Sequence, residues 1–126
     1  MLIVDDEEFV VSMLSDLFRE AGCEVASADD GYLALQRVIE ARPDVIVLDV
    51  RMPHMDGFEA AHRLKANPDF CSIPIAAFTV LQDEQTRQRA IAEGIELVLH
   101  KPADAKQIVR QVLGLAGRAV SAATPA

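Results

Sequence analysis

The stretch VIVLDVRMPHMDG, residues 45–57, contains the clearest indication of the fold. It is apolar up to Leu48, carries a charge at Asp49 and is interrupted at Pro53 and Gly57. A continuous apolar run of this kind is typical of a strand buried on both faces, as in a parallel sheet covered by helices on both sides. The sequence therefore predicts that the Asp49 carboxylate lies at the end of a buried strand, directly before a loop.

Short apolar runs alternate with segments of helical spacing along the whole chain. The five predicted strands are LIVD (2–5), EVASA (24–28), DVIVLD (44–49), PIAAFT (74–79) and ELVLH (96–100). Connections between parallel strands are right-handed, and helices then cover both faces of the sheet. The alternation predicts an α/β fold, a doubly wound (βα)5 flavodoxin-like sandwich with a five-stranded parallel sheet.

The segments between the strands contain apolar residues at helical spacing, which predicts the buried face of each helix. The residues expected to face the core are Phe9, Val10, Met13, Leu14, Leu17 and Phe18 in the first helix, Leu33, Leu35, Val38 and Ile39 in the second, and Ile108, Val109, Val112 and Leu113 in the last.

The length of 126 residues suits one domain with a single core. We assign residues 1–117 to this domain. The sequence ends in GRAVSAATPA, which is small and polar, so we expect residues 118–126 to form a flexible C-terminal tail.

The composition limits the classes of partner. The chain has 20 acidic and 12 basic residues and no basic stripe, so we expect no nucleic-acid contact. It has no apolar run of membrane-spanning length and no secretory signal, which predicts a cytoplasmic protein without membrane contact. Cys23 and Cys71 lack CxxC or metal-ligand spacing.

Chemically reactive side chains occur where the predicted strands end. These are Asp5 and Asp6, Asp49, Thr79 and Lys101. The carboxyl ends of the strands converge on one crevice, where clustered carboxylates would repel one another unless a divalent cation such as Mg²⁺ compensated them. A hydroxyl and an ammonium group beside them could bind phosphoryl oxygens, and one carboxylate could then form an aspartyl phosphate. Asp49 is the candidate nucleophile, because its strand leads directly into a loop that exposes the side chain, whereas the adjacent Asp5 and Asp6 are better placed to share the metal.

Five segments together resemble one known family. They are IVDDEE, GCEVASADDGYLAL, VLDVRMPHMDG, IPIAAFT and LHKP, in this order, and the resemblance runs from about Leu2 to Leu115. The chain resembles the receiver domains of two-component response regulators and is similar to stand-alone chemotaxis-type regulators.

The resemblance implies a phosphorylation-controlled signalling domain. Asp49 would accept a phosphoryl group from a sensor histidine kinase or a histidine phosphotransfer protein. Asp5, Asp6, Asp49 and the backbone carbonyl of Arg51 would surround Mg²⁺. The surface formed by helix four, strand five and helix five would change and bind a downstream protein.

The resemblance also implies how the phosphoryl group would be sensed. Thr79 and Lys101 would bind its oxygens, and Thr79 would shift toward it. Two positions depart from the family pattern: Val80 replaces the usual alanine or glycine, and Val98 replaces the usual aromatic residue of strand five.

Other functions remain open from the residues alone. A Mg²⁺-dependent aspartyl-phosphate phosphohydrolase would normally carry its nucleophile after the first strand, and a flavin or nucleotide binder would not have DDEE at its phosphate loop. We expect a phosphoryl acceptor rather than a turnover enzyme. A receiver cut from a longer regulator or hybrid kinase is the alternative to a stand-alone protein.

Overall fold

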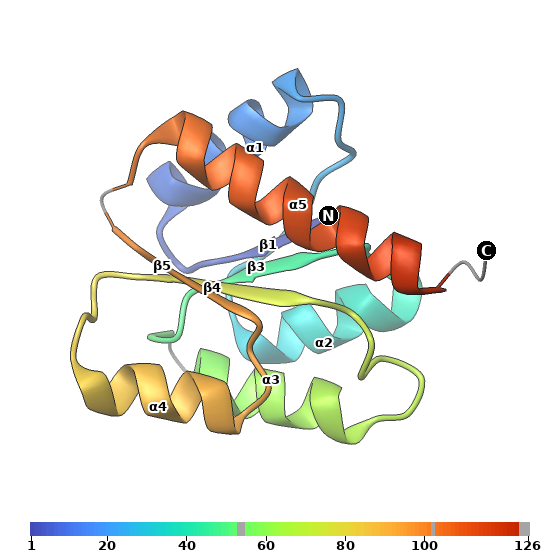
Figure 1. The fold of residues 1–126 in the computed structure, drawn as a ribbon, viewed down its shortest axis with the longest axis vertical. Coiled ribbons are helices and arrows are strands. Elements are labelled where there is room, and N and C mark those ends of the chain that lie inside the picture. The colour runs from blue at the N-terminus through green and yellow to red at the C-terminus, as the bar shows by residue number, and fades with distance from the viewer. Residues whose placement is uncertain (53–54, 102, 124–126) are drawn as a thin grey trace.

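The computed structural model describes residues 1–52, 55–101 and 103–123 and confirms the predicted fold class (Figure 1). Pro53 and Pro102 lie outside the described residues. The strands are β1 (Leu2–Val4), β2 (Ala26–Ala28), β3 (Ile46–Leu48), β4 (Ile75–Thr79) and β5 (Leu97–His100). The helices are α1 (Glu8–Glu20), α2 (Gly31–Glu40), α3 (Gly57–Ala66), α4 (Glu84–Ala92) and α5 (Ala105–Ala123).

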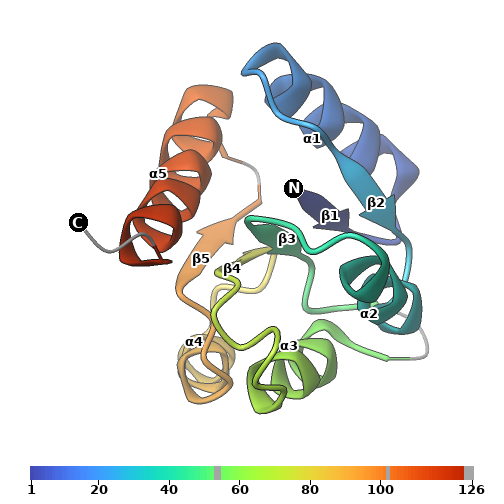
Figure 2. The ribbon, with the colours of Figure 1, turned by 90° about the vertical axis from the view of Figure 1, so that its right-hand side faces the viewer.

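All five strands form one parallel sheet in the order β2-β1-β3-β4-β5. Helices α1 and α5 cover one face, and α2, α3 and α4 cover the other (Figure 2). Strand β3 lies at the centre, and its three residues are buried, as the apolar run predicted. The strand order reverses between β1 and β3, which is where open α/β sheets bind their ligands.

Alternating strand residues divide the core into two layers. Val4, Ile46 and Leu48 pack toward α2 and α3, whereas Ile3 and Val47 pack toward α1 and α5. Each strand residue therefore contributes to one layer only.

Three predicted core positions are wrong because they lie beside the buried stripe. In α1 the buried face is centred on Val10, Leu14 and Phe18, so Phe9, 79% exposed, and Met13, 37% exposed, point toward solvent. In α2 the buried stripe runs through Gly31, Ala34 and Val38, so Ile39, one position beyond Val38, lies off this stripe and is 71% exposed. Periodicity located the face but not its width.

Helix α4 has a much thinner contact with the core than the other helices. Within α4, every residue of which is described, Ala90 is the one buried residue. The N-cap residue of the helix is Asp83, whose side chain accepts hydrogen bonds from the backbone N–H and the hydroxyl of Thr86. The cap satisfies a backbone N–H of the first turn and so stabilises the start of α4.

Helix α5 continues to Ala123, into the segment for which we expected a flexible tail. The domain boundary at residue 117 stays a prediction. Within the described part of the chain, no helix has the length and apolarity needed to span a membrane.

Candidate functional site

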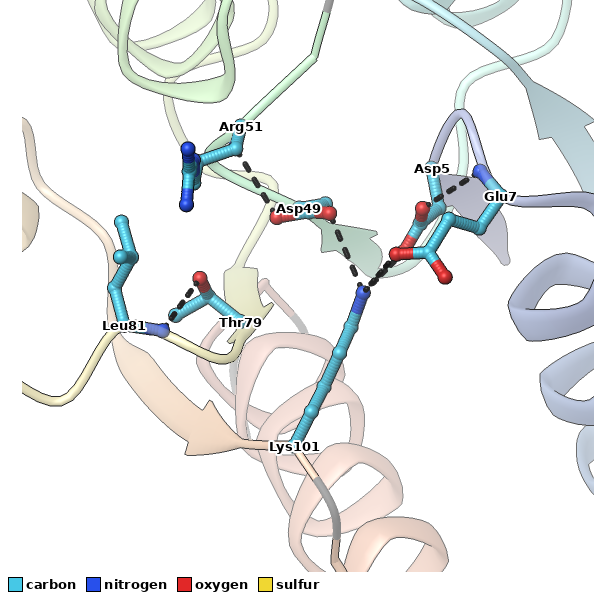
Figure 3. Close-up of polar contacts among 7 residues, drawn as sticks. All are labelled: Asp5, Glu7, Asp49, Arg51, Thr79, Leu81 and Lys101. Atoms are coloured by element: carbon cyan, nitrogen blue, oxygen red, sulfur yellow. Dashed lines mark hydrogen bonds and ion pairs between the residues drawn. The ribbon is translucent and has the colours of Figure 1, made fainter.

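The predicted site residues meet at the carboxyl edge of the sheet. Asp5 follows β1, Asp49 follows β3 and Thr79 ends β4, and these three side chains are buried although they are polar. Lys101 follows β5 and extends toward the two carboxylates (Figure 3). The fold thus brings together groups that are far apart in the sequence.

Three carboxylates form a cluster that suits a hard divalent cation. One carboxylate oxygen from each of Asp5, Asp6 and Asp49 lies within 4.8 Å of the other two. Asp5 and Asp49 are buried, whereas Asp6 is exposed at the rim. The donors are all oxygen atoms, which favours Mg²⁺, Ca²⁺ or Mn²⁺ over metals that prefer thiolate or imidazole ligands.

Lys101 compensates part of this negative charge. Its Nζ donates hydrogen bonds to Asp5 Oδ2 at 2.8 Å and to Asp49 Oδ2 at 3.3 Å. It also forms an ion pair with Glu7 Oε1 at 3.8 Å. The motif-based prediction did not include Glu7, although its place in DDEE next to the acidic pair was the available signal.

The Asp49 carboxylate is held at both oxygens. Oδ1 accepts a hydrogen bond from the backbone N–H of Arg51 at 3.1 Å, and Oδ2 accepts one from Lys101. Burial raises the pKa of Asp49, the Asp5 charge adds to this, and the Arg51 N–H and Lys101 oppose it; the net result lies above the ordinary value. The negative charge of the buried Asp49 carboxylate is therefore poorly hydrated, and a bound cation would stabilise it.

The pKa of Lys101 reflects two opposing effects. Burial lowers it, but the hydrogen bond to Asp5 and the charges of Asp49 and Asp5 together outweigh burial, so the pKa of Lys101 lies above its ordinary value. The side chain therefore remains a cation through the physiological pH range. A fixed positive charge beside Asp49 suits the binding of an anionic group there.

The Thr79 side chain is completely buried and forms a local hydrogen bond. Its Oγ1 accepts from the backbone N–H of Leu81 at 3.2 Å (Figure 3). This bond uses the oxygen as an acceptor and leaves the hydroxyl hydrogen available as a donor. Val80 and Val98 are the two positions that depart from the family pattern. Val80 is 57% exposed, and Val98 is partly buried against the core layer that faces α2 and α3.

Gly57 fixes the loop that carries Asp49 against the start of α3. A Cβ atom at this position would lie 2.3 Å from the Asp49 carbonyl oxygen and 2.7 Å from the Val50 Cα. The backbone N–H of Gly57 donates to the Val50 carbonyl at 3.1 Å. Only glycine permits this approach of two backbones.

A cavity of about 500 Å³ opens beside the carboxylate cluster. Asp6, Arg51, Phe58 and Arg89 are among its lining residues, and the Arg89 guanidinium lies 4.5 Å from the centre of the Phe58 ring. The cavity gives a small molecule or a partner side chain access to the rim of the site.

The comparison with protein families gives a match over most of the chain. The family model described as the response regulator receiver domain matches residues 1–113. Response regulator PleD of Caulobacter vibrioides is 36% identical over 115 residues, which are 91% of this chain and 25% of PleD. The chain therefore spans about a quarter of the length of this curated relative.

Solved structures similar to this chain have nearly the same length. Chemotaxis protein CheY4 of Vibrio cholerae superposes with a TM-score of 0.86 at 32% identity, covering 90% of this chain and 95% of that one. The receiver domain of a sensor histidine kinase of Pseudomonas aeruginosa, solved with a magnesium ion coordinated in its active-site cleft, gives a TM-score of 0.85 at 26% identity, covering 92% and 95%.

Proposed function

The chain belongs to the receiver domains of response regulators, which are phosphorylation-controlled signalling domains, and we propose that Asp49 is the residue that accepts the phosphoryl group. The position of its carboxylate carries the proposal. Asp49 follows the central strand β3, and a partly buried cation, Lys101, lies at its Oδ2. An anion held beside a cation at the crevice of an α/β sheet suits reaction with a phosphorylated donor.

The chemistry follows from these contacts. An Asp49 carboxylate oxygen attacks the phosphorus atom, and a new oxygen–phosphorus bond forms. The bond between phosphorus and the leaving atom of the donor breaks, and the electron pair departs with that atom. Lys101 and the free hydroxyl hydrogen of Thr79 bind the phosphoryl oxygens, on which negative charge is concentrated.

We also propose that the carboxylate cluster holds Mg²⁺ through Asp5, Asp6 and Asp49, with the backbone carbonyl of Arg51 as a further ligand. The all-oxygen donor set and the magnesium ion in the related Pseudomonas aeruginosa receiver domain support this assignment. When bound, Mg²⁺ supplies positive charge that offsets the repulsion among carboxylate and phosphoryl oxygens.

The family implies the partners of this reaction. We propose that a sensor histidine kinase or a histidine phosphotransfer protein is the donor, and that a downstream protein binds the surface of α4, β5 and α5. The weak anchoring of α4 by Ala90 supports a change at this surface. We further propose a cytoplasmic location and no direct contact with nucleic acid, in line with the formal net charge of −8.

The experiment is phosphorylation of the purified protein by acetyl phosphate with Mg²⁺, followed by intact-mass measurement. One phosphoryl group per chain is expected, and hydroxylamine should remove it because it is an acyl phosphate. Asp49→Asn should abolish labelling, whereas Asp16→Asn, an exposed residue of α1, should label like the wild type. Full labelling of Asp49→Asn would refute the assignment, and sustained multiple-turnover hydrolysis of phosphomonoesters would favour a phosphohydrolase.

A further inference from the structure

The backbone of Leu81 is held at both of its peptide groups. Its N–H donates to Thr79 Oγ1 at 3.2 Å, and its carbonyl oxygen is 3.1 Å from His100 Nδ1. A carbonyl oxygen only accepts hydrogen bonds, so Nδ1 must carry the hydrogen and act as the donor. Leu81 therefore connects the candidate phosphoryl-binding hydroxyl to a histidine on β5 (Figure 3 shows the Thr79 end of this connection).

The sheet places His100 well for this contact. Thr79 and His100 are directly paired across β4 and β5, and the Lys101 N–H donates to the Thr79 carbonyl at 2.8 Å. Alternate residues of a strand point to the same face, so the His100 side chain lies on the face of Val98, toward α4. His100 is thus the next side chain after Val98 on this face of β5, and Val98 stands where the family usually has an aromatic residue.

We propose that His100 restrains the loop after β4 in its unphosphorylated position by holding the Leu81 carbonyl, and so couples the state of Asp49 to the edge of strand β5. This inference rests on the proposed function. A Thr79 hydroxyl that binds a phosphoryl oxygen on Asp49 moves toward β3 and draws the Leu81 N–H with it. The movement lengthens the contact between the Leu81 carbonyl and His100, so the hydrogen bond favours the resting state.

The sign of the effect follows from population shift. A bond present only in the resting state lowers the apparent affinity of any ligand that selects the phosphorylated conformation. Removing the bond should therefore tighten binding of the phosphoryl analogue trifluoroberyllate. Because His100 is exposed, we expect a gain of about two- to fivefold, the range of a weak net hydrogen bond.

The test measures the apparent dissociation constant of trifluoroberyllate in the presence of Mg²⁺ by ¹⁹F NMR titration. His100→Leu removes the hydrogen-bond donor. His100→Asn introduces a side chain with the same branching at Cγ as leucine, but it keeps an N–H donor at the δ position. His62→Leu is the matched control, because His62 is also exposed but contacts Glu93, the C-cap residue of α4, and not the loop after β4. We expect tighter binding for His100→Leu alone, together with a larger shift of the Leu81 amide signal.

Each outcome has a definite meaning. Equal affinities for His100→Leu and the wild type, or equal changes in His100→Leu and His100→Asn, would overturn the inference while leaving the proposed function intact. No binding of trifluoroberyllate to the wild type would overturn the proposed function, and the inference with it.

Discussion

The Lys101 ammonium group lies 2.8 Å from the Asp5 carboxylate, although 96 positions separate the two residues in the sequence. The contact joins the end of β5 to the end of β1 across the mouth of the site, and it also brings Lys101 within 3.3 Å of Asp49. This lysine therefore contributes to the stability of the carboxylate cluster before any phosphoryl group arrives.

Lys101→Met should destabilise the metal-free protein, because the substitution leaves Asp5 and Asp49 without their cation. We expect a loss of about 2 kcal/mol in the free energy of unfolding, the scale of a hydrogen bond between charged groups. Urea unfolding in EDTA measures it. Lys106→Met, at an exposed position of α5, is the control, and equal losses for both variants would contradict the role of Lys101.

Asp49→Asn should stabilise the metal-free protein at neutral pH. Burial raises the pKa of Asp49 above its ordinary value of 3.8, so the folded state loses stability as the pH rises from 3.8 through the folded-state pKa. Asparagine carries no charge and does not incur this loss. Urea unfolding in EDTA across a pH series should show an advantage for the variant that disappears below pH 3.8. A stability advantage of Asp49→Asn that grows on acidification would contradict the predicted direction of the pH dependence.

Millimolar Mg²⁺ should raise the melting temperature of the wild type, because a cation that binds only the folded state stabilises it by mass action. At ten times the dissociation constant the gain is about 1.4 kcal/mol, or a few degrees. Asp6→Ala should reduce the gain, whereas Asp16→Ala should keep it. A melting curve of the wild type that does not respond to Mg²⁺ would show that the carboxylates are not a metal site.

Gly57→Ala should be destabilising by about 1–3 kcal/mol, because its Cβ would lie 2.3 Å from the Asp49 carbonyl oxygen. It should also slow phosphorylation, since the displaced backbone carries the acceptor. Gly114→Ala in α5 is the control: nothing lies within 4 Å of its Cβ, so helix propensity should stabilise the protein by up to about 1 kcal/mol. Calorimetric melting of both variants measures the contrast, and similar stabilities would refute it.

Sequence patterns predicted the features that a short local stretch of the chain determines. The apolar run before Asp49 predicted a buried parallel strand, and the polar residues at the ends of the strands predicted a shared crevice. These predictions succeed because burial on both faces and the direction of parallel strands leave few alternatives.

The sequence did not predict features that depend on how elements pack. Phe9 and Ile39 are apolar and lie at helical spacing, yet they are exposed because the sheet covers only a narrow stripe of each helix. The contact of His100 with the Leu81 carbonyl was equally inaccessible, since it depends on strand pairing and on the course of a loop. Tertiary geometry decides both cases.

The single buried residue of α4 has a consequence for native-state fluctuations. A helix that buries only Ala90 can separate from the sheet at little cost, so it should form the lowest-energy cooperative opening unit of the domain. Its amide hydrogens should exchange with solvent well before those of β3, whose three residues are all buried. Ordering such a unit takes up part of the binding free energy of any partner, so affinity at this face would be adjusted through the rigidity of α4 without any new contact.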